Sequence, residues 1–107
     1  TLELRMQRMC ANAKTIAQAI ESAAPQLKPN YPDIGFIIGL TFAGAQEAEA
    51  FIDRCPAILP ATSFGGVHTS AERRARWGDE VEEGYVRLSV GCEPTAALLA
   101  SITEALT

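Results

Sequence analysis

The feature that most constrains this chain is a strict alternation of apolar residues within residues 35–43. Phe36, Ile38, Leu40 and Phe42 occupy every second position there. A period of two places these four side chains on one face of a β-strand. Because all four are large and apolar, other elements of the chain must cover that face.

A second strand is predicted over residues 85–90. Val86, Leu88 and Val90 form its apolar face. Successive side chains of a strand point to opposite faces of the sheet, so Arg87 should stand on the face away from the core.

Three segments have helical rather than strand periodicity: residues 2–20, residues 45–54, and the segment that opens at Pro94. Pro25 and the prolines after it end the first helix. The stripes expected to be buried are Leu2, Met6, Met9, Ala13, Ile16 and Ile20 in the first helix, Ala48, Phe51 and Ile52 in the second, and Leu98, Ile102 and Leu106 in the third.

Between the second and third helices, the pattern is shorter and less regular. Residues 58–63 predict a short strand, and Pro60 within it favours an edge position. Residues 69–72, with the sequence Thr-Ser-Ala-Glu, fit a capping box, which predicts a short helix through Trp77 that Gly78 closes. Together these elements predict an α+β domain, with a small, mostly antiparallel sheet covered on one face by helices.

Length and composition favour one globular domain over residues 1–107. The net charge of −4 argues against a nucleic-acid partner, because such proteins concentrate Lys and Arg. No apolar run approaches the roughly 20 residues of a membrane span. The three cysteines are widely separated, which indicates free thiols in a reducing cytoplasm. The opening Thr-Leu-Glu-Leu-Arg-Met resembles the interior of a longer chain more than a natural start.

Standard catalytic sets are missing from the sequence. His68 is the only histidine, so no metal site is expected, and Gly65-Gly66 is more typical of a turn than of an anion-binding loop. Arg87 is the most informative residue, since a guanidinium fixed on a strand presents a planar fork that suits a carboxylate. The alternative is a cross-strand ion pair between Arg87 and one of the chain's acids.

Two motifs, in this order along the chain, bear on the role of Arg87. They are Ser63-Phe64-Gly65-Gly66-Val67 and Val86-Arg87-Leu88-Ser89-Val90-Gly91-Cys92-Glu93. They resemble motifs of the Cys/Met-metabolism family of pyridoxal-phosphate (PLP) enzymes, which includes cystathionine γ-synthase, cystathionine γ- and β-lyases and methionine γ-lyase. Residues 4–13 are also similar to the long helix that begins the C-terminal domain of this family. The resemblance implies that residues 1–107 are the small C-terminal domain of a fold-type I PLP enzyme, without its cofactor-binding domain.

The resemblance also implies roles for two residues. The family's arginine in the second motif binds the substrate α-carboxylate, which corresponds to Arg87, and the serine of the first motif lies near the same carboxylate, which corresponds to Ser63. This sequence departs from the family's pattern at Phe64, where leucine is more usual, and in a shorter segment between Gly66 and Arg87. Because this segment is shorter, the resemblance does not identify the substrate.

The cofactor side of such an active site is not expected in this chain. Lys14 and Lys28 are the only lysines, and neither lies in the family's Ser-x-Thr-Lys setting. We therefore expect PLP in the parent enzyme, none bound to this chain, and no catalytic residue within it. The resemblance implies an N-terminal PLP-binding domain as partner, a homotetrameric parent, and trans-sulfuration chemistry of the cystathionine γ-lyase or γ-synthase type.

Two other readings stay open from the sequence. The chain could be a free-standing α+β module that regulates or binds an amino acid through the Arg87 face, or a dimerisation domain. The coding sequence before Thr1 separates the first of these from the parent-enzyme hypothesis, because an upstream half would carry the Schiff-base lysine.

Overall fold

The computed structural model describes residues 2–32, 34–55, 59–60, 69–74 and 81–106. Helix α1 leads through a 3-10 turn into strand β1, and helix α2 then connects to the other strands. The elements are α1 (Leu2–Ala23), η1 (Pro25–Leu27), β1 (Ile37–Thr41), α2 (Ala45–Arg54), β2 (Leu59–Pro60), β3 (Ser70–Arg73), β4 (Tyr85–Ser89) and α3 (Thr95–Leu106).

The strands form one sheet in the order β1-β4-β3-β2. Strand β4 is antiparallel to both of its neighbours, β1 and β3, whereas the two-residue β2 runs parallel to β3. The predicted α+β fold with a mostly antiparallel sheet is confirmed. Strand β2 lies at the edge of the sheet, as Pro60 predicted.

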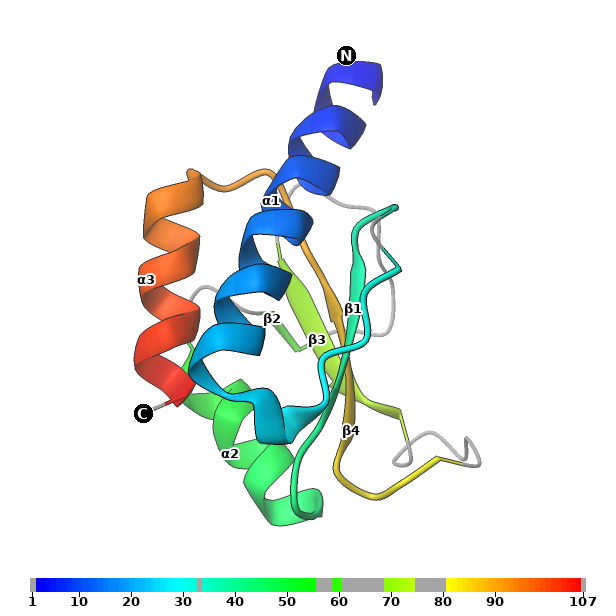
Figure 1. The fold of residues 1–107 in the computed structure, drawn as a ribbon, viewed down its shortest axis with the longest axis vertical. Coiled ribbons are helices and arrows are strands. Elements are labelled where there is room, and N and C mark those ends of the chain that lie inside the picture. Colours follow the sequence, from blue (N-terminus) through cyan, green and yellow to red (C-terminus); the bar gives the residue numbers. More distant parts are fainter. Residues whose placement is uncertain (1, 33, 56–58, 61–68, 75–80, 107) are drawn as a thin grey trace.

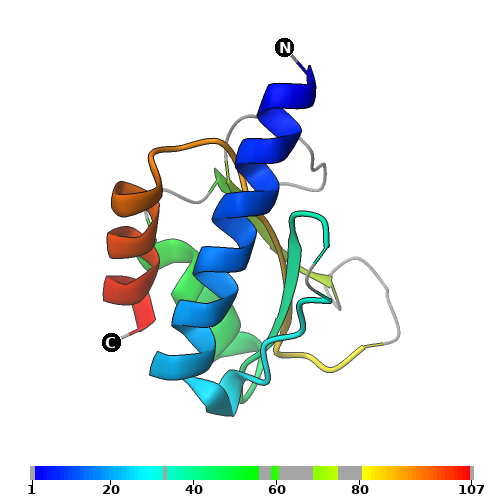
Figure 2. The same ribbon diagram turned by 45° about the horizontal axis from the view of Figure 1, so that its top comes forward.

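The three helices pack on one face of this sheet (Figure 1). Helices α1 and α3 lie side by side, and α2 crosses beneath them, as a second view also shows (Figure 2). The core lies between the two layers. Its largest fully buried side chains include Phe51, Met9, Ile16, Ile20, Ile38, Leu40, Val86, Leu88, Val90, Leu98 and Ile102.

The alternating apolar residues at the centre of β1 and β4 are buried, as predicted. Ile38 and Leu40 of β1 are fully buried, as are Val86 and Leu88 of β4. Helix α2 also buries the predicted residues, Ala48, Phe51 and Ile52. The periodicity of these segments therefore identified both the elements and the faces they bury.

The predicted helix from Thr69 is wrong over residues 70–73, which form strand β3. The partners of a capping box are engaged elsewhere. The backbone N–H of Thr69 donates to Glu93 (2.7 Å), and the carboxylate of Glu72 accepts from Arg74 (2.8 Å) instead of reaching back to Thr69. Pairing of β3 with β4 thus overrides the local helix signal. Trp77 and Gly78 lie outside the described residues.

The predicted stripe of α1 is too long at its N-terminal end. Leu2 is 66% exposed, Met6 is half-buried, and burial begins at Met9. The first turns of α1 project past the end of the sheet (Figures 1 and 2), so no core surface is there to cover them. In α3, Ala105 is buried, whereas Leu106 is only partly buried against the core.

Candidate functional site

Arg87 stands on the sheet face opposite the helices. Its neighbours in β4, Val86 and Leu88, are fully buried in the core, while its own side chain is 25% exposed. In the register of the sheet, Arg87 pairs with Glu72 on β3 and with Gly39 on β1. The sequence therefore placed Arg87 on the correct face.

Among the described residues, the Arg87 guanidinium shares an ion cluster with Glu72 and Arg74. The Arg87 Nη2 group donates to Glu72 Oε1, and the same oxygen accepts from Arg74 Nη1 at 2.8 Å. The Glu72 side chain is only 6% exposed. Its second oxygen, Oε2, is buried and has no hydrogen-bond partner among the described residues. The cross-strand ion pair that the sequence offered as an alternative is thus present.

On the other side of Arg87, the sheet surface is open to a small hollow. Tyr85 extends over Gly39, because a Cβ added to Gly39 would lie 2.6 Å from the Tyr85 hydroxyl. Both residues border a hollow of about 450 Å³ that also touches Phe36 and Ile37. Arg87 is therefore flanked by a buried acid on one strand and by a glycine with a largely apolar hollow on the other.

Arg73 belongs to a separate set of ion pairs. Its guanidinium bonds Glu49 of α2 at 3.1 Å and Glu83 at 2.7 Å. The hydrogen bond with Glu49 raises the pKa of Arg73 above its ordinary value, and the bond with Glu83 adds to this effect. Arg73 is thus held by acids that do not contact Arg87.

Two polar residues, Asn12 and Glu93, fix the segment that follows β4, and sequence reasoning assigned neither a role. Asn12, which is buried in α1, donates to the carbonyls of Gly91 and Glu93 at 3.0 and 2.9 Å. Its side-chain oxygen accepts from the Thr95 hydroxyl at 2.6 Å. Asn12 lies in residues 4–13 and Glu93 in residues 86–93, two segments that resemble the family. That resemblance was the one sequence signal that could have identified them.

Glu93 makes the second of these connections. Its carboxylate accepts from both the backbone N–H and the hydroxyl of Thr69, each at 2.7 Å. The Thr69 oxygen in turn accepts from the backbone N–H of Gly91 at 2.9 Å. The chain entering β3 is thereby tied to the chain leaving β4.

Ser63 lies outside the described residues, as do Gly65, Gly66 and His68. The predicted pairing of Ser63 with Arg87 at one carboxylate therefore stays a prediction. Within the described part of the chain, no group of three or more His, Cys, Asp or Glu residues could hold a metal ion. No described helix is both long and apolar enough to span a bilayer.

Neither lysine of this chain has the setting of a Schiff-base lysine. Lys14 on α1 and Lys28 after η1 are the only lysines, and both are exposed. A Schiff-base lysine works in an enclosed pocket that holds the cofactor ring. Helix α1, which carries Lys14, belongs to the helical layer (Figure 1). Arg87 faces away from that layer, because it alternates with the buried Val86 and Leu88.

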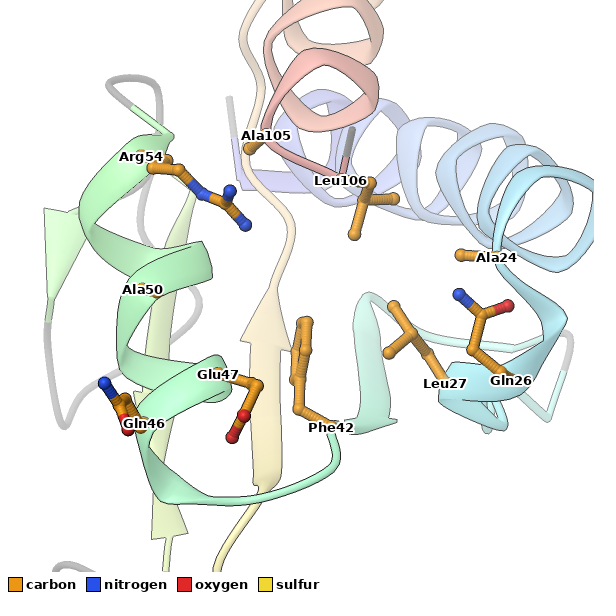
Figure 3. Close-up of a pocket in the computed structure, with 10 residues that line it drawn as sticks. All are labelled: Ala24, Gln26, Leu27, Phe42, Gln46, Glu47, Ala50, Arg54, Ala105 and Leu106. Carbon is orange, nitrogen blue, oxygen red and sulfur yellow. The ribbon is translucent and has the colours of Figure 1, made fainter.

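A second cavity, of about 490 Å³, lies between the ends of η1, α2 and α3. Figure 3 shows Phe42, Leu27 and Leu106 pointing into it, with Glu47 and Arg54 at its margin. These residues include no nucleophile with a neighbouring base, so the cavity has no catalytic arrangement.

Known proteins resemble this chain over nearly its whole length. It is 35% identical to a Streptomyces coelicolor protein described as "Putative cystathionine gamma-lyase" and 32% identical to the L-methionine gamma-lyase of Pseudomonas deceptionensis, with 99% of the chain aligned in each case. The O-acetylhomoserine sulfhydrylase of Wolinella succinogenes has the same fold, with a TM-score of 0.86 at 25% identity over 100% of this chain and 35% of that one. No model of a protein family matches the chain.

The chain spans about a third of the length of the curated relatives it matches, 31% and 34% for the two lyases above. Fold and sequence together define a helix-covered, mostly antiparallel α+β domain of carbon–sulfur lyases and related enzymes. Over nearly its whole length, the chain is similar to the C-terminal part of PLP-dependent lyases of the Cys/Met-metabolism family.

Proposed function

We propose that this chain is the substrate-carboxylate-binding domain of a PLP-dependent trans-sulfuration enzyme of the cystathionine γ-lyase or γ-synthase type. The observation that carries the proposal is the position of Arg87 on the sheet face that the helices leave uncovered. The homology of nearly the whole chain to carbon–sulfur lyases supports it.

Arg87 would bind the α-carboxylate of an amino-acid substrate. Its planar guanidinium can donate two parallel hydrogen bonds to one carboxylate, which fixes the orientation of the substrate as well as its position. Because Arg87 lies on the central strand β4, paired on both sides, its backbone is firmly held. Ser63 would contact the same carboxylate.

The cofactor would be held by an N-terminal domain, since both lysines of this chain are exposed. The isolated chain is therefore proposed to be inactive and to complete an active site only in the parent, which we propose to be a homotetramer. The three free cysteines, Cys10, Cys55 and Cys92, agree with a cytoplasmic location.

The proposal is tested by Arg87→Ala in the full-length enzyme. Truncation removes charge-assisted hydrogen bonds worth about 1.5–3 kcal/mol. We expect KM for the amino-acid substrate to rise about tenfold or more, with a smaller change in kcat. Glu49→Gln is a matched control, since it perturbs an ion pair that does not include Arg87. An unchanged kcat/KM in Arg87→Ala would contradict the assignment.

A further inference from the structure

Glu72 is in direct contact with the Arg87 guanidinium. It sits on β3 directly opposite Arg87 in the register of the sheet, and its Oε1 accepts from Arg87 Nη2. We propose that Glu72 is a positioning residue for Arg87, which it holds in the orientation that binds the substrate carboxylate. This inference rests on the proposed function of Arg87.

The burial of Glu72 supports a positioning role. Its side chain is 6% exposed, whereas Glu49 and Glu83, the acids that bind Arg73, are 37% and 73% exposed. Exposed ion pairs are mobile and contribute little, but a buried carboxylate can hold its partner in one geometry. Among these three acids, Glu72 is the most buried.

Glu72 also holds a second guanidinium close to that of Arg87. Glu72 accepts from two guanidiniums, those of Arg74 and Arg87, through one oxygen. Arg74 therefore strengthens the field at the site, and Glu72 keeps the two cations together despite their mutual repulsion.

The orphaned oxygen of Glu72 is consistent with this arrangement. Its Oε2 is buried and has no hydrogen-bond partner among the described residues. A buried carboxylate oxygen without a donor costs free energy, so an acid at this position is not explained by the stability of the described part of the chain alone. Its function is to orient Arg87.

A competing role for Glu72 predicts a change of KM in the opposite direction. If Glu72 occupied Arg87 in place of the substrate, its neutralisation would release the guanidinium and lower KM. If it orients Arg87, neutralisation lets the guanidinium move and raises KM. The two roles are therefore separated by the direction of a single kinetic change.

The test is a double-mutant cycle in the full-length enzyme, with Glu72→Gln, Arg87→Ala and the double variant. We expect Glu72→Gln to raise KM about tenfold and to leave kcat within about twofold, because the reacting groups lie elsewhere. In the Arg87→Ala background, Glu72→Gln should change KM no further, since it acts only through Arg87. Glu49→Gln is the control and should leave both constants unchanged.

A second variant tests whether the effect of Glu72→Gln comes from misfolding. Glu72→Asp keeps the charge with a shorter side chain, and it should give a KM between those of the wild type and Glu72→Gln. An unchanged or lowered KM in Glu72→Gln, or an additive effect in the double variant, would overturn the positioning role while Arg87→Ala still lowers kcat/KM. If Arg87→Ala itself had no effect, the proposed function would fail instead.

Discussion

At the scale of single residues, the structure depends on buried polar side chains that join distant segments. Asn12 satisfies three groups from the connection between β4 and α3, which lies about 80 positions further along the chain. The local sequence gives little indication of the structural role of an asparagine within an apolar helical stripe. Its importance comes from leaving no buried donor or acceptor unpaired.

Replacement of Asn12 by alanine should therefore destabilise the domain. The carbonyls of Gly91 and Glu93 would lose their donor, and the Thr95 hydroxyl would lose its acceptor. We expect the free energy of unfolding to fall by about 2–3 kcal/mol, measured by urea denaturation. Gln18→Ala, on the exposed side of the same helix, is the control. Equal stabilities of the two variants would refute this role for Asn12.

At the scale of elements, periodicity identified the long segments and failed where tertiary pairing decides. The strands around Leu40 and Leu88 and the helix around Phe51 followed from their patterns, because each pattern matches the surface that covers it. Strand β3 did not, since its helix-like signal at Thr69 is overridden by contacts with Glu93, which lies 24 positions later. Similarly, the ion cluster at Glu72 depends on a register that no local pattern specifies.

Gly84, in the turn before β4, and Gly39, in β1, should respond differently to alanine. A Cβ on Gly84 would lie 2.2 Å from the backbone oxygen of Phe42, so the main chain itself must shift. We expect Gly84→Ala to cost about 1–3 kcal/mol of unfolding free energy. Gly39→Ala should cost less, because the atom it meets is the hydroxyl of Tyr85, the end of a movable side chain. Thermal unfolding measures both, and a larger loss in Gly39→Ala would contradict this account.

At the scale of the whole molecule, two regions lie outside the core between the helices and the sheet. The first turns of α1 expose Leu2 and Leu4, at 66% and 64%, and the outer sheet face carries Arg87 with its ion cluster. In the proposed function, the Arg87 face completes an active site together with another domain, and the two lysines of this chain, Lys14 and Lys28, are exposed.

The isolated chain should therefore not form a specific Schiff base with PLP. At cofactor concentrations that saturate the full-length enzyme, borohydride reduction followed by mass spectrometry should label a lysine of the full-length enzyme outside residues 1–107. Stoichiometric labelling of Lys14 or Lys28 in the isolated chain would contradict the division of the active site proposed here.

The central claim is that Arg87 receives the substrate carboxylate. Its most direct test is a crystal structure of the full-length enzyme with a bound amino-acid substrate or analogue. We predict the ligand carboxylate within hydrogen-bond distance of the Arg87 guanidinium, about 2.7–3.0 Å, while Glu72 still contacts Arg87 from the neighbouring strand. A carboxylate bound by other residues, with Arg87 paired only to Glu72, would contradict the account.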